Sequence, residues 1–202
     1  MIILYFFIGL VLSFLGSIPI GLITLTITQK TIEKGRTSGL MIALGATIIE
    51  FIYTFIALVS LDFFANNDEI GQYIKMFATV LFLGLGAYYF FKKNTTSLKP
   101  TPTYDYFDFF RGIAVGAMNL LIVPFWIFLG LWLESNGYIF DNYDIITSFS
   151  FGSAIGALLI FLIYIWLSET IINKSKQIKR YTNKAVGIIF FGLGILQLIQ
   201  LL

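Results

Sequence analysis

The sequence predicts an all-α integral membrane protein with six transmembrane helices. Of its 202 residues, 58% are hydrophobic and only 12% are charged, whereas soluble domains carry about 25% charged residues. The apolar residues form long runs, and a helix of roughly 20 apolar residues crosses a bilayer. The runs cover residues 2–28, 37–61, 72–91, 109–133, 145–167 and 185–202. We therefore expect a single transmembrane domain over residues 1–202.

The basic residues alternate along the connecting segments. Loops 1, 3 and 5 contain nearly all the Lys and Arg, and the fourth loop contains acids only. Cytoplasmic loops carry an excess of basic residues, so we expect loops 1, 3 and 5 in the cytoplasm and both termini outside. The first apolar run has no basic segment before it, which favours a retained helix over a cleaved signal.

Two residue types on which much enzyme chemistry depends are absent. The chain has no cysteine and no histidine, which excludes thiol redox relays, disulfides, His-based triads and the usual zinc or copper sites. Proton chemistry must then rely on carboxylates. We expect no catalytic residue, no metal site, no cofactor and no nucleic-acid partner.

A weak repeat relates the two halves of the chain. The matching positions, all at nearly the same separation, are Pro19 and Pro124, Gly45 and Gly152, and Gly84-Leu85-Gly86 and Gly192-Leu193-Gly194. Three helices per half require the halves, about 1–92 and 108–202 with a linker at 93–107, to have opposite orientations. Two such inverted repeats are typical of secondary transporters. The alternative is a chance alignment of glycines, which are frequent in membrane helices.

The first and fourth apolar runs contain helix-breaking residues near their centres. Pro19 lies between Gly16 and Gly21, and Pro124 follows Asn119. A proline removes a helical hydrogen bond, and an interrupted helix exposes backbone N–H groups and a positive half-helix end. We expect helices 1 and 4 to be broken or kinked, with the two breaks holding an anionic group at the midplane. The alternative is a pair of ordinary proline kinks.

Glu50 is the one charged residue of the second apolar run. An ionised carboxylate near the bilayer centre costs at least about 2.5 kcal/mol, and intramembrane acids are functional by default. We expect Glu50 to bind a substrate amine or to carry a proton, with Tyr53 on the same helical face. Ser17 and Thr24, beside the first break, complete the candidate binding residues. The alternative is a neutral glutamic acid bonded to a neighbouring carbonyl.

Two further groups of residues have structural interpretations. Asp108 and Arg111 are spaced to pair at the start of the fourth run, and we expect a solvated ion pair at the cytoplasmic interface. Gly152 and Gly156 have the small-xxx-small spacing of close helix contacts. These glycines are expected to pack helices together or to form a dimer face.

Residues 35–53 resemble the second-helix signature of the lysine-exporter (LysE/RhtB) superfamily of amino-acid exporters. The matching positions, in the register of that family, are Gly35-Arg36, Gly39-Leu40, Gly45, Glu50 and Tyr53. Pro19 with Gly21 is similar to the family's P-G-P motif, and Arg111-Gly112 with Asn119 is similar to its R-G…N-P motif. The chain departs from the family at Ile20, Leu22 and Leu120, where prolines are common, and at Leu121, where many members have lysine.

The resemblance implies a secondary transporter in a bacterial cytoplasmic (inner) membrane. Its expected substrates are amino acids or related small zwitterionic or cationic metabolites, exported with a proton gradient or the membrane potential as driving force. A homodimer in the lipid bilayer is implied as well. The alternatives are a passive small-solute or ion channel, an intramembrane enzyme and a subunit of a membrane complex.

Overall fold

The computed structural model describes residues 2–18, 21–61, 107–119 and 121–168, together with isolated positions between 63 and 91 and between 188 and 198. The helices are α1 (Ile2–Gly16), α2 (Leu22–Lys34), α3 (Arg36–Val59), α6 (Asp108–Ala117), α7 (Ile122–Ser135) and α8 (Tyr143–Trp166). By length and composition α3 and α8 can each cross a membrane, and α6 and α7 together are long and apolar enough to form a third, bent span. The predicted all-α membrane class is confirmed for these residues. The expected third and sixth helices lie mostly outside them, so the six-helix inverted repeat stays a prediction.

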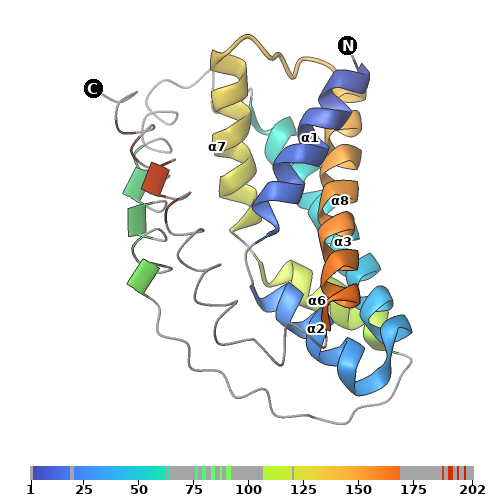
Figure 1. Ribbon diagram of the computed structural model, residues 1–202. Coiled ribbons are helices and arrows are strands. Elements are labelled where there is room, and N and C mark those ends of the chain that lie inside the picture. The colour runs from blue at the N-terminus through green and yellow to red at the C-terminus, as the bar shows by residue number, and fades with distance from the viewer. Residues whose placement is uncertain are drawn as a thin grey trace.

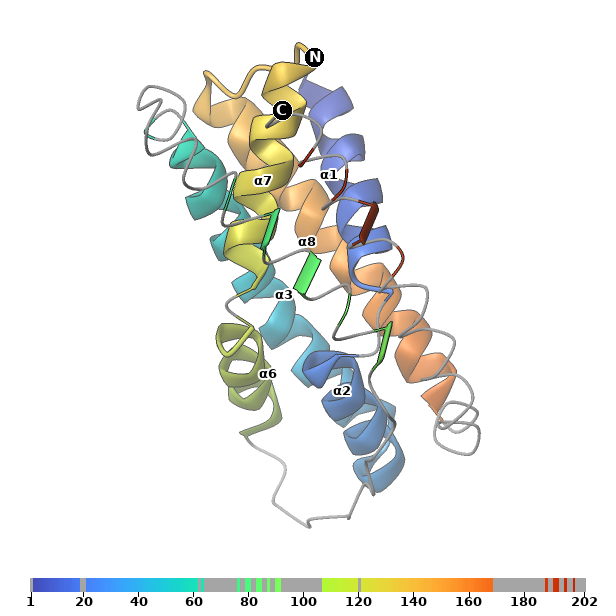
Figure 2. The same ribbon diagram turned by 90° about the vertical axis from the view of Figure 1, so that its left-hand side faces the viewer.

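Two long helices run through the bundle, and four shorter helices pack on them at two levels. Helices α3 and α8 extend along the whole length of the described bundle (Figures 1 and 2). Helices α1 and α7 lie at the end that carries the N-terminus, and α2 and α6 lie at the opposite end. The closest packing joins α1 to α8 and α6 to α3. The first and fourth apolar runs therefore each form two half-helices, one at each level.

Glycines bring the paired helices to backbone contact. A Cβ atom on Gly152 would lie 1.9 Å from the carbonyl oxygen of Phe6, so no larger residue fits between α8 and α1. A Cβ atom on Gly45 would lie 2.2 Å from the carbonyl oxygen of Phe109, at the contact of α3 with α6. The predicted packing role is confirmed, and Gly156 likewise faces α1.

The basic segment expected as the first loop is helical, so that prediction was wrong. Helix α2 continues through it to Lys34, with an ion pair of 2.6 Å between Lys30 and Glu33, one turn apart. It ends at Gly35, whose φ of +94° lies in the left-handed region that favours glycine. Helix α3 begins at the next residue, so a single glycine turns the chain.

The buried apolar residues form two clusters, one toward each end of the bundle. The first includes Trp126 and Phe149, and the second includes Ile27 and Ile42. Along α3 and α8, polar residues separate the two clusters. The buried polar residues at this level include Ser13, Glu50, Thr54 and Ser153. A polar layer thus crosses the middle of the bundle, near both helix breaks.

Candidate functional site

Glu50 accepts hydrogen bonds from three other helices at the centre of the bundle. Its Oε1 atom accepts from Nε1 of Trp126 at 3.1 Å. The hydroxyl groups of Ser13 and Ser153 donate to the same atom, each at 3.3 Å. These donors lie on α7, α1 and α8, whereas Glu50 lies on α3 and is only 8% exposed. One carboxyl oxygen therefore joins four helices, and we call these residues together with Thr54 the Glu50 cluster.

The hydroxyl groups of the cluster suit both protonation states of the carboxyl. Thr54 donates from Oγ1 to the main-chain carbonyl of Glu50 at 2.8 Å, and its Oγ1 lies 2.9 Å from Oγ of Ser153. Ser153 has one proton and two neighbouring acceptors, Oγ1 of Thr54 and Oε1 of Glu50. It can donate to an ionised Glu50, or donate to Thr54 and accept from a protonated Glu50. Each of these hydroxyl groups therefore keeps a hydrogen-bond partner whether Glu50 is protonated or ionised.

The first helix break lies between the end of α1 and the start of α2. Pro19, one of the predicted site residues, falls outside the described residues. Gly21 precedes α2, and its amide donates to Oγ1 of Thr24 at 2.9 Å. A Cβ atom on Gly21 would lie within 4 Å of no heavy atom of the described residues, so none of these residues packs against the backbone there. Thr24 therefore stabilises the helix start. The amide of Ser17 donates to the main-chain carbonyl of Ser13 at 2.9 Å and so completes the last turn of α1.

The second break separates α6 from α7, and the two half-helices meet at an angle of 59°. Asn119 lies within it, and its carbonyl accepts from the amide of Ile122 at 3.2 Å. The half-buried side-chain amide of Asn119 has no hydrogen-bond partner among the residues that the structure describes. Pro124, which was expected inside the break, occupies the first turn of α7, where a missing N–H is tolerated. The break therefore comes before Pro124 and is centred on Asn119.

A comparison with protein families identifies the family of this chain. The model of the LysE type translocator family matches residues 14–201. The chain belongs to this family. It is therefore a membrane protein that transports solutes, as the resemblance of its motifs implied. No curated protein and no solved structure matches the LysE-type chain significantly.

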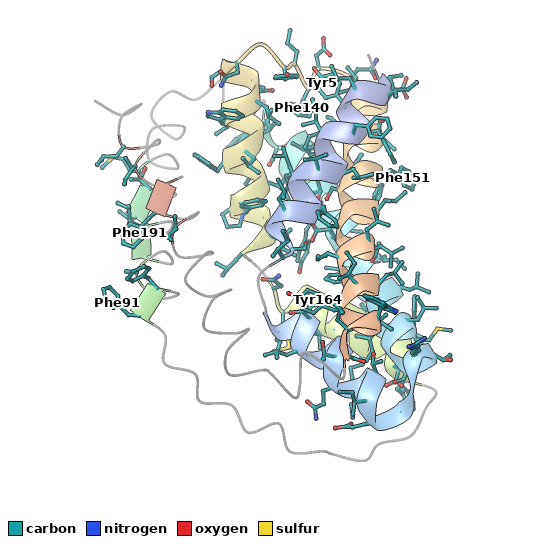
Figure 3. All side chains as sticks on the ribbon, viewed as in Figure 1. Tyr5, Phe91, Phe140, Phe151, Tyr164 and Phe191 are labelled. Carbon is teal, nitrogen blue, oxygen red and sulfur yellow. The ribbon has the colours of Figure 1, made fainter. Side chains whose placement is uncertain are left out.

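Two tyrosines of the translocator donate to carbonyl groups at the breaks. Tyr53 on α3 donates to the carbonyl of Ala117, the last residue of α6, at 2.9 Å. Tyr164 on α8 donates to the carbonyl of Ile18, just after α1, at 2.5 Å. Figure 3 shows Tyr164 at the level where α1 gives way to α2. Tyr53 was predicted as a neighbour of Glu50, but its hydroxyl group reaches the second break.

Asp108 of the translocator is buried, so the expectation of a solvated ion pair was wrong for this residue. It is 2% exposed and accepts hydrogen bonds from Arg111 and, at 2.5 Å, from Ser38 on α3. The burial results from the close approach of α6 to α3. A Cβ atom on Gly112 would lie 2.1 Å from the carbonyl oxygen of Ile42. The three polar side chains thus join α3 to α6 near the end of the bundle.

Four members of the Glu50 cluster were missed by sequence reasoning. The residues that were not among the predicted site residues, although each has a polar group within an apolar run, are Ser13, Thr54, Trp126 and Ser153. Ser13 lies about one helical turn before the first break, and Trp126 lies about one turn after the second. Ser13 and Trp126 could therefore have been singled out by their distance from a break, although not as partners of Glu50.

Proposed function

We propose that this translocator is a secondary transporter that exports amino acids or related small zwitterionic or cationic metabolites. Export is coupled to a proton gradient or to the membrane potential. The observation that carries the proposal is the Glu50 cluster, in which one buried carboxyl contacts α1, α7 and α8 beside both helix breaks. A single acid bonded to several helices can link its protonation to their arrangement.

The two breaks supply groups that suit a substrate carboxylate. Helices α2 and α7 both begin at a break, and helix N-termini favour anions through their free N–H groups and dipole. Asn119 offers a side-chain amide at the second break, and at the first break no described residue packs within 4 Å of a Cβ atom on Gly21. In this proposal the breaks hold the carboxylate, and Glu50 binds the amine or exchanges a proton.

The charge distribution supports one orientation in the membrane. The basic residues Lys34, Arg36 and Arg111 lie on the helix ends at the level of α2 and α6, whereas Asp141 and Asp144 lie near the connection to α8 at the N-terminal level. The positive-inside rule then places the α2 and α6 end in the cytoplasm of a bacterial cell and the N-terminus outside. A homodimer is the assembly that we propose in the bilayer.

Solute screening in proteoliposomes tests the proposed function. Vesicles containing the purified chain are loaded with each of the twenty protein amino acids in turn, and efflux is measured with and without an imposed pH gradient or membrane potential. We expect at least one amino acid to leave against its own concentration gradient when a driving force is applied. Flux that only follows the solute gradient would identify a passive channel, and no flux of any amino acid would contradict the proposed substrate class.

A further inference from the structure

Each helix break leaves a main-chain carbonyl without its helical partner. In a continuous helix the carbonyl of Ala117 would accept from the amide of Leu121, and that of Ile18 would accept from the amide of Leu22. Neither bond is among the main-chain hydrogen bonds of the described residues. In a bilayer an unpaired carbonyl is strongly unfavourable. An open break therefore needs a substitute donor at each of these two carbonyls.

The two tyrosine hydroxyl groups are the substitute donors, and they act in a crossed arrangement. Tyr53 on α3 donates to the carbonyl at the second break, and Tyr164 on α8 donates to the carbonyl at the first break. Each tyrosine lies on a long helix and bonds to the end of the short helix that packs closely against it. The close packing is at Gly45 between α3 and α6, and at Gly152 between α8 and α1. The same chemistry occurs twice, once in each half of the chain.

We propose that Tyr53 and Tyr164 are positioning residues that hold the two helix breaks open, each acting on the break in the opposite half of the chain. Without the hydroxyl group, a helical turn would again supply a donor to each carbonyl, from the amide of Leu121 to Ala117 and from the amide of Leu22 to Ile18. Loss of a tyrosine hydroxyl group therefore shifts its break toward a closed helical turn. The inference rests on the proposed function in one respect, namely that the open breaks are the substrate site.

Amide hydrogen exchange of the full-length protein in lipid nanodiscs, without any solute, tests this directly. The variants are Tyr53→Phe and Tyr164→Phe, which retain the ring and remove the hydroxyl group. Tyr5→Phe is the matched control, because Tyr5 also donates to a carbonyl, that of Ile139 at 2.9 Å, but away from both breaks. Exchange is followed in the peptides that cover residues 17–24 and 116–123.

We expect each Phe variant to slow exchange at the break that it serves. The exchange rate should fall roughly three- to twentyfold, which corresponds to the free energy of one hydrogen bond between membrane helices. The other break and the Tyr5→Phe protein should exchange at the wild-type rate. Unchanged exchange at the served break, or an equal change at both breaks, would overturn the proposal. Either variant alone is sufficient if the other does not fold, and because no solute is present, the result is independent of whether amino acids are the substrate.

Discussion

Replacing Trp126 by Phe tests whether the indole group holds Glu50 in place. Trp126 is 1% exposed and packs edge-to-face against Phe149, with ring centroids 5.4 Å apart. Phe retains an aromatic ring there but removes the N–H group that donates to Oε1 of Glu50 at 3.1 Å. The indole N–H is an obligate donor, so no alternative proton placement can replace it.

The expected loss of stability follows from that one bond. A buried hydrogen bond to a carboxyl group inside a membrane protein contributes about 1 to 2 kcal/mol. For a chain of this length, 1 kcal/mol corresponds to about 2 to 4 °C in melting temperature. Trp126→Phe should therefore lower the melting temperature by roughly 2 to 8 °C, measured by size-exclusion chromatography after heating in detergent.

A double-mutant cycle with Glu50→Leu separates the bond from the smaller ring volume. The Leu side chain has no acceptor, so in this background Trp126→Phe reduces the ring volume but removes no hydrogen bond to a carboxyl group. Trp126→Phe should then cost less in the Glu50→Leu background than in the wild type, by about the 1 to 2 kcal/mol of the bond. An equal cost in both backgrounds would refute the reasoning, because the loss would then come from packing alone.

Two further substitutions test the packing of the half-helices. Gly152→Ala places a methyl group against the backbone of α1 and should lower stability by about 1 to 3 kcal/mol. Gly84→Ala is the control, because Gly84 is exposed and an added Cβ atom would lie within 4 Å of no heavy atom of the described residues. It should not lower the melting temperature, and equal losses in the two variants would contradict the glycine contact. Asp108→Asn removes the charge that pairs with Arg111 and should lower the melting temperature by several degrees, whereas Asp144→Asn, at an exposed helix start, should change it by less than about 2 °C. No loss in Asp108→Asn would show that the buried ion pair does not stabilise the contact of α3 with α6.

The positions of the two breaks could be predicted because their signals are local. A proline beside glycine, or an asparagine in an apolar run, changes the hydrogen bonding of its own helix wherever that helix lies. Glu50 could be singled out for a similar reason, since a charge in the middle of an apolar run differs from its neighbours however the helices pack, and its functional role stays a prediction. The exact extent of each break was less predictable. Pro124 was expected within the second break, but a proline in the first turn of a helix breaks no bond.

The partners of these residues could not be predicted, because they depend on how separate helices pack. Ser13, Trp126 and Ser153 reach Glu50 from three helices, and the rotation of those helices is set by backbone contacts such as that at Gly152. The burial of Asp108 depends in the same way on how closely α6 approaches α3. Hydropathy identifies which residues enter the membrane, but it contains no information on which faces of two helices meet.

The most direct test of the account is proton flux through Glu50. Purified protein is reconstituted in vesicles with an entrapped pH indicator, and an amino acid that the wild-type protein transports is added outside. Glu50→Gln should abolish the solute-dependent pH change, and Glu33→Gln, at the end of α2 and outside the Glu50 cluster, should retain it. A wild-type pH change in Glu50→Gln vesicles would contradict the central role of this carboxyl.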